Sequence, residues 1–383
     1  MQTATNRFQE HLGIEPTDIH PEFNHVEGTS KKALAWFGSK NVRMVAASIP
    51  DITEPDDVIL QVTGTTICGS DLHLYHGEIM ALQKGDILRH EFMGKVFKVG
   101  PNVKNLKLGQ RVVSSFQISC GKCDYCRENL FVLLQNYMYG QRDAGSFGYS
   151  HFTGEFPRTK QNIVPDEKAL YLSDVLPTSY HTVVDTGVKP GDVVGVWGLG
   201  PIGQCAARWA LLEGASRVIE IDRVHSRLQF AEDKSGIETI DFSQYSDVTK
   251  RIYELCPRGL DVAPDCGTFH EPKTLTHKIQ KTLMLETDVS ETINEMIVSV
   301  RKMGRCGIIA VDAGFANAIN VGALMEKGVR LIGNGQAPIR KYWEEIFNEY
   351  IIPGKFDPTF MITHRVPIDD LAKLYPAFRQ SHR

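Results

Sequence analysis

A cysteine, a histidine and an aspartate in the first half of the chain are candidates for a catalytic zinc site. Cys68 opens the segment Cys68-Gly69-Ser70-Asp71-Leu72-His73, and His90 is followed directly by Glu91. A thiolate and an imidazole suit zinc, and a catalytic site needs three protein ligands with one position open. Asp174, in the segment LSDVLPTSYH, is a candidate for the third ligand.

A second group of cysteines has metal-binding spacing. Cys120, Cys123 and Cys126 form the pattern C-x-x-C-x-x-C. Three thiolates on one short segment need a cation, and a structural zinc takes four ligands. An iron–sulfur cluster is the rival interpretation, but the completing Cys-Pro of the ferredoxin pattern is absent. Leu134 follows this group and cannot bind a metal.

A glycine-rich segment further along indicates dinucleotide binding. The pattern G-x-G-x-x-G is formed by Gly198, Leu199, Gly200, Pro201, Ile202 and Gly203. It stands between the strand-like run DVVGVW (192–197) and a helix expected from Pro201 to about Glu213. Glycines there permit a tight turn and close approach of the backbone to a pyrophosphate, which the helix N-terminus attracts.

The acid that should follow this pattern is Asp222. It closes the run RVIEID (217–222), where a carboxylate can accept ribose hydroxyls and would repel a 2′-phosphate. This favours NAD over NADP. Arg223 and Arg227 follow closely, and cations there could accommodate the additional phosphate, so NADP stays an alternative.

The elements that must position these residues change in rhythm near residue 180. Before it lie short β-rich runs such as VILQVTG (58–64) and GKVFKVG (94–100), which fit a barrel-like β domain. After it, strands and helices alternate, which predicts a parallel sheet covered by helices on both faces. The further strands are expected at 238–242, 261–266, 305–311 and 330–335, with helices around 245–255 and 288–302. Pro264 is unexpected in a central strand.

Composition restricts the class of protein. The 383 residues are 42% hydrophobic and carry a net charge of −4, from 42 basic and 46 acidic side chains. We therefore expect two domains and no nucleic-acid partner. The first thirty residues have the features of neither a signal nor a transit peptide, and no apolar run is long enough to span a membrane. A soluble, cytoplasmic protein is the expectation.

These motifs together resemble one family. The segments Cys68–His73, His90–Gly94, Cys120–Cys126 and Gly198–Gly203 occur in the order and spacing of zinc-dependent medium-chain alcohol dehydrogenases. CGKCDYCREN, GSFGYSHFTG, LSDVLPTSYH and PTFMITHRVP are similar to the glutathione-independent formaldehyde dehydrogenases within that family. The resemblance implies a GroES-like β-rich catalytic domain at 30–180, completed by 336–383, and a Rossmann NAD-binding domain at 181–335. Dimers or tetramers are also implied.

The resemblance also implies roles for individual residues. Cys68, His90 and Asp174 would bind the catalytic zinc, with Glu91 beneath the metal. Zinc would activate the oxygen of a small alcohol or aldehyde while hydride passes between its carbon and the nicotinamide. Ser70 would accept the alcohol proton and pass it through the cofactor ribose towards His73, which delivers it to solvent.

Four departures from the family pattern are the argument for a protein of a different class, one that binds a dinucleotide but has lost catalysis. Arg89 stands where the family has glycine, and Leu134 stands where it has the fourth structural cysteine. Compared with the family, the chain is expected to lack a strand-bearing segment between Gly154 and Asn162, and to reach Arg383 without the last strand that returns to the catalytic domain. The second zinc site would be vacant or weakly held, for instance with help from Asp124. A polyol dehydrogenase of this fold, and a dinucleotide-binding protein without catalysis, are the alternative functions.

Overall fold

The computed structural model describes residues 25–53, 55–78, 82–119, 127–128, 144–146, 159–161, 165–267, 288–310 and 316–380. The chain forms two compact units. The first combines Met1–Asp174 with Ile339–Arg383, and the second is Val175–Pro338. The first unit is therefore built from two separate stretches of chain.

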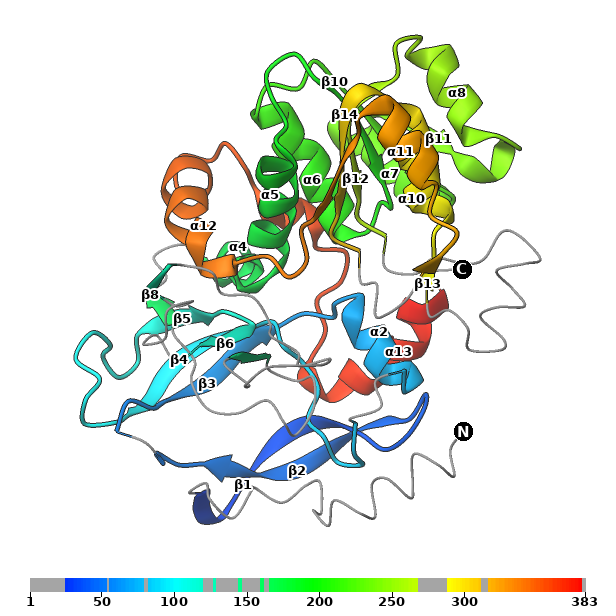
Figure 1. Cartoon of the computed structure of the whole chain (residues 1–383). Coiled ribbons are helices and arrows are strands. Elements are labelled where there is room, and N and C mark those ends of the chain that lie inside the picture. Colours follow the sequence, from blue (N-terminus) through cyan, green and yellow to red (C-terminus); the bar gives the residue numbers. More distant parts are fainter. Residues whose placement is uncertain are drawn as a thin grey trace. The chain divides into compact units, whose positions relative to one another are not determined.

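Antiparallel strands dominate the first unit (Figure 1). Strands β1 and β2 form a hairpin, β6 pairs with β7, and a four-stranded sheet has the order β3-β4-β5-β8. Thr65, the last residue of β3, pairs with Phe92, the first of β4, so the chain that leaves β3 lies beside the chain that enters β4. The bounds are β1 His25–Trp36, β2 Val42–Pro50, β3 Val58–Thr65, β4 Phe92–Val99, β5 Arg111–Ser114, β6 Gln117–Ser119, β7 Ala144–Ser146 and β8 Thr159–Gln161.

Close packing of β3 on β4 explains why the segment His90–Gly94 ends in glycine. A β-carbon on Gly94 would lie 2.4 Å from the carbonyl oxygen of Gln61, which no side chain can tolerate. A strand-bearing segment was expected to be missing between Gly154 and Asn162. In this range the structure contains β8, which is three residues long and pairs with β5. The edge of β5 is therefore covered there.

Helices complete the first unit. Their bounds are α2 Ser70–His76, α4 Asp166–Ala169, η1 Leu170–Ser173, α12 Ile339–Glu345, η3 Ile346–Ile351, η4 Pro358–Met361, η5 Ile368–Asp370 and α13 Leu371–Gln380. One apolar core joins β1, α2 and α13, in which Leu34, Leu72, Leu74, Leu371 and Tyr375 are buried. The last part of the chain thus packs against the segment that follows β3.

The second unit contains a six-stranded parallel sheet in the order β11-β10-β9-β12-β14-β16. This order reverses between β9 and β12, as in doubly wound folds that bind ligands at that point. The predicted parallel sheet is confirmed. The bounds are α5 Val175–Thr186, β9 Val193–Trp197, α6 Pro201–Leu212, β10 Arg217–Asp222, α7 His225–Ser235, β11 Glu238–Asp241, η2 Phe242–Gln244, α8 Val248–Leu255, β12 Leu260–Asp265, β13 Asp288–Val289, α10 Glu291–Ser299, β14 Val300–Ile308, β15 Ala316–Asn317, α11 Val321–Lys327 and β16 Arg330–Gly333.

The end of α10 differs from the prediction. A helix was expected to continue to residue 302, but α10 ends at Ser299 and β14 begins at Val300. Val300 pairs with Leu260, so the partner strand decides the conformation of this segment. Pro264 does lie in the central strand β12, but β9 pairs there with Val262 and Asp265, which leaves the proline out of that ladder.

No helix in the described part of the chain is long and apolar enough to cross a membrane. One apolar core of the second unit is formed by the sheet together with α8 and α10. Its buried members include Trp197, Ile219, Ile221, Ile252, Ile293, Met296 and Ile297.

Glu220 is an unusual member of the central sheet. Its side chain in β10 is 1% exposed, and its Oε2 accepts no hydrogen bond within the described residues. Burial raises the pKa of Glu220 to about 8, while Arg208 opposes this rise and Asp222 adds to it. The pKa of Glu220 in the folded state is thus above its ordinary value. The contribution of this group to the free energy of unfolding is therefore complete in acid and is lost as pH rises towards 8.

We therefore predict that Glu220→Gln reduces the fall in stability between pH 5 and pH 8. The difference in unfolding free energy between variant and wild type should grow by about 3 kcal/mol over this interval. Urea unfolding at both pH values measures it. Glu238→Gln, on the neighbouring strand and paired with Arg217 at the surface, is the control. Parallel pH dependence in wild type and Glu220→Gln would contradict the prediction.

Candidate metal centre and dinucleotide-binding loop

Two strand ends and one helical turn position the candidate metal ligands. Cys68 lies in the turn between β3 and α2, and His90 and Glu91 lie directly before β4. The pairing of β3 with β4 therefore brings the two segments together. Asp174 follows η1, whose Leu172 carbonyl accepts a hydrogen bond of 2.6 Å from Trp343 Nε1. A residue from the last part of the chain thus holds the turn that presents Asp174.

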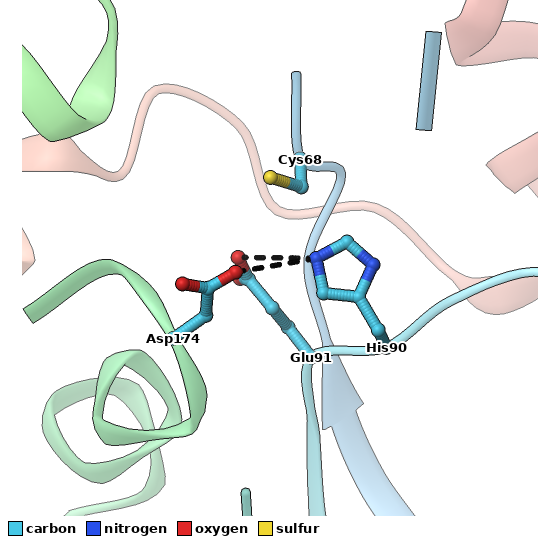
Figure 2. Close-up of side chains that lie close together, drawn as sticks. All are labelled: Cys68, His90, Glu91 and Asp174. Atoms are coloured by element: carbon cyan, nitrogen blue, oxygen red, sulfur yellow. Dashed lines mark ion pairs between the residues drawn. The ribbon is translucent and has the colours of Figure 1, made fainter. Parts of the chain in front are cut away.

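The side chains of Cys68, His90, Glu91 and Asp174 converge (Figure 2). One ligand atom of each lies within 4.8 Å of the others. His90 Nε2 is 3.3 Å from Asp174 Oδ2 and 3.9 Å from Glu91 Oε1. The structure therefore brings together the three predicted ligands and the predicted acid beside them.

The electrostatics of this cluster favour a cation. Burial raises the pKa of Glu91 to about 7, and the charge of Asp174 adds to the effect. Burial likewise raises the pKa of the Cys68 thiol. Burial alone would lower the pKa of His90, but hydrogen bonds to Asp174 and Asp71 outweigh it and raise that pKa well above its ordinary value. A divalent cation among these donors would offset the repulsion between the carboxylates and favour the thiolate.

The donor set fits zinc. Sulfur, imidazole nitrogen and carboxylate oxygen are its common ligands, and three of them leave a fourth position for a substrate. Glu91 Oε1 accepts no hydrogen bond within the described residues, and it lies close to the other donors. Cys68, His90 and Asp174 would hold the metal, with Glu91 at its side.

Neighbouring residues orient these side chains. Asp71 Oδ2 accepts a hydrogen bond of 2.9 Å from the Cys68 backbone N–H, and Asp71 Oδ1 lies 3.6 Å from His90 Nδ1. The Thr66 hydroxyl donates to Glu91 Oε2. Neither Asp71 nor Thr66 was predicted as a site residue, although both lie within three residues of Cys68 in the sequence. Such partners fix ligand orientation and are a regular part of metal sites.

Ser70 and His73 share one face of α2, three residues apart. Ser70 is buried, whereas His73 pairs through Nδ1 with Glu78 Oε2 at 2.5 Å. Glu78 Oε1 lies 3.4 Å from His76 Nδ1. Burial opposes ionisation of Glu78, but His73 and then His76 outweigh it and lower the pKa of this carboxyl. The Glu78 carboxylate is therefore charged beside His73, and this partner was not predicted from the sequence.

The glycine-rich loop of the second unit has the conformation expected for phosphate binding. Gly198 has a φ of 85°, and a β-carbon there would lie 2.7 Å from Gly267 Cα. A β-carbon on Gly203 would collide with the Gly198 carbonyl, so both glycines are required by packing. Gly200 has open space instead, and Pro201 begins α6. Open space above a helix N-terminus suits a phosphate.

Asp222 ends β10 and supports this loop. Its Oδ2 accepts a hydrogen bond of 2.7 Å from Leu199 N–H, and its Oδ1 accepts from the backbone N–H groups of Arg223 and Val224. Arg227 Nη1 lies 3.8 Å from Asp222 Oδ2. The carboxylate is therefore both a loop brace and a charged group at the predicted ribose position.

Cys120, Cys123 and Cys126, as well as Leu134, lie outside the described residues. The predicted second metal site is therefore not tested by the structure.

Comparisons with known proteins agree with this geometry. The alcohol dehydrogenase GroES-like domain family matches residues 54–156. A zinc-type alcohol dehydrogenase-like protein of Schizosaccharomyces pombe is 37% identical over 373 residues, which cover 91% of this chain and 88% of that protein. The chain belongs to the zinc-type alcohol dehydrogenase family. The predicted family and the predicted fold class, GroES-like plus Rossmann, are thus confirmed.

Proteins with other names are also similar to the chain. A glutathione-independent formaldehyde dehydrogenase of Pseudomonas aeruginosa is 28% identical over 388 residues, which cover 91% of this chain and 95% of that protein. The solved structure of alcohol dehydrogenase TADH from Thermus sp. ATN1 has a TM-score of 0.75 at 26% identity, and covers 91% of this chain and 97% of its own.

The metal centre leads to a prediction for Cys68→Ala. Loss of the thiolate should remove about one zinc per chain, because two protein ligands hold zinc poorly. Elemental analysis of dialysed wild type and variant measures the difference, whatever the second cysteine cluster binds. Cys205→Ala removes a buried thiol of α6 and is the control. Equal zinc in wild type and Cys68→Ala would exclude Cys68 as a ligand.

Proposed function

We propose that the chain is a zinc-dependent oxidoreductase that transfers hydride between a small alcohol or aldehyde and NAD. The convergence of Cys68, His90 and Asp174, with Glu91 beside them, supports this proposal most strongly. It favours an active enzyme over a dinucleotide-binding protein without catalysis. The names of its relatives support an alcohol or aldehyde substrate.

Zinc, when bound, would polarise the substrate oxygen, and the nicotinamide would carry the hydride. The chain's own residues would supply the proton path. The Ser70 hydroxyl would accept the alcohol proton, and His73 would pass it outwards. Glu78 pairs with His73 Nδ1 and would therefore fix the tautomer of that imidazole. Because Glu78 is half exposed, it would also connect the proton path to solvent.

Asp222 supports NAD as the partner. Its carboxylate ends β10 with a negative charge at the predicted ribose position, where the 2′-phosphate of NADP would be repelled. Arg227, beside it, is held by that same carboxylate. Homo-oligomer formation and a cytoplasmic location stay predictions.

Activity and metal dependence test the proposal together. Purified protein with NAD and a panel of short alcohols, including hydrated formaldehyde, should produce NADH, measured at 340 nm. A zinc chelator should abolish this production, and Cys68→Ala should lose it while still binding NAD, as measured by calorimetry. Chelator-resistant turnover, or wild-type rates in Cys68→Ala, would remove zinc from the mechanism.

Replacement of Asp222 should change cofactor preference. In Asp222→Ser we expect the ratio of kcat/KM for NADP to that for NAD to rise by at least about tenfold, because the repelling charge is lost. NAD should also bind more weakly, since Leu199 N–H loses its acceptor. Asp241→Ser, at the end of the adjacent strand β11, is the control. An unchanged ratio would mean that Asp222 does not face the ribose.

A further inference from the structure

Arg89 occupies a backbone conformation that favours glycine. Its φ is 100°, in the left-handed region, although it directly precedes the ligand His90. Its side chain is only 7% exposed. A buried arginine with strained backbone persists only where surrounding contacts hold it in place.

Three contacts hold the guanidinium. Nη1 donates to the Thr66 carbonyl, and it lies 3.3 Å from Asp71 Oδ2. The guanidinium carbon lies 5.2 Å from the ring centroid of Tyr375, which is fully buried on α13. Nε and Nη2 have no hydrogen-bond partner among the described residues, so the aromatic face is an important part of the environment of this cation.

Each polar contact reaches a residue that supports the metal centre. Asp71 binds the Cys68 backbone N–H and faces His90 Nδ1. Thr66, whose carbonyl accepts from Arg89, donates its hydroxyl to Glu91. Arg89 therefore contacts the supports of Cys68, His90 and Glu91 at the same time, on the side where α13 packs.

We propose that Arg89 is a positioning residue for the metal centre, and that it couples helix α13 to metal retention through Tyr375. The inference rests on the proposed zinc site. Without the guanidinium, the buried Asp71 carboxylate loses its countercharge and the Thr66 carbonyl loses a donor. Both segments that support the ligands then lose a restraint.

Metal release tests the inference without turnover. Cobalt-loaded Arg89→Ala and Arg89→Gly should release metal to a chromogenic chelator at least about tenfold faster than wild type. Their thiolate-to-cobalt absorption band should also shift, because the geometry at Cys68 changes. Arg89→Lys should restore part of the slow release. Arg111→Ala, which removes an arginine paired with Asp166 in the same unit, should release metal at the wild-type rate.

The Arg89→Gly variant distinguishes positioning from simple occupation of a glycine position, because glycine adopts this φ without strain. If Arg89→Gly released metal at the wild-type rate and kept the wild-type thiolate-to-cobalt absorption band, the proposal would be overturned. Tyr375→Phe keeps the ring and should behave as wild type, whereas Tyr375→Leu should release metal faster. Equal rates of metal release from Tyr375→Phe and Tyr375→Leu would overturn the proposed coupling of α13 to metal retention. Wild-type protein that binds cobalt but oxidises no alcohol would refute the proposed function alone.

Discussion

The candidate metal centre of the first unit places two buried carboxylates beside a thiol and an imidazole. Moving a carboxylate out of water costs several kcal/mol unless it is paired, and Glu91 and Asp174 also repel each other. A divalent cation offsets both terms, so metal binding and the closure of this region are thermodynamically linked. The β3–β4 register and the turn held by Trp343 therefore have the same effect, because each brings negatively charged donors to the metal centre.

In the second unit one carboxylate has an observed role in the loop and a proposed role at the cofactor. Asp222 braces the glycine-rich loop through Leu199 N–H and carries the charge expected to face a ribose. The proposed function therefore couples loop geometry and cofactor recognition in a single side chain. The same strand carries the buried Glu220, so β10 has two acids in different environments. Asp222 is held by backbone donors, whereas Glu220 Oε2 has no hydrogen-bond partner among the described residues.

Local patterns explain how much of this could be predicted from the sequence. Residues 217–222 were predicted as a strand and form β10 with those bounds, because an apolar run ending at an acid is a local signal. The predicted start of β14, at residue 305, was wrong, because the extended conformation of Val300 depends on pairing with Leu260. The metal-site residues that converge were predictable from motifs. The contact of Arg89 with Tyr375 was not, because it depends on how α13 packs against a segment far away in the sequence.

The discontinuous first unit has a consequence for biosynthesis. Val175–Pro338 leaves the ribosome as one continuous stretch and can complete its sheet while translation continues. The core that contains Leu72 and Leu74 must wait for Leu371 and Tyr375, which are made after the whole of the second unit. Until they are made, Leu72 and Leu74 of α2 lack the α13 side chains that share their core.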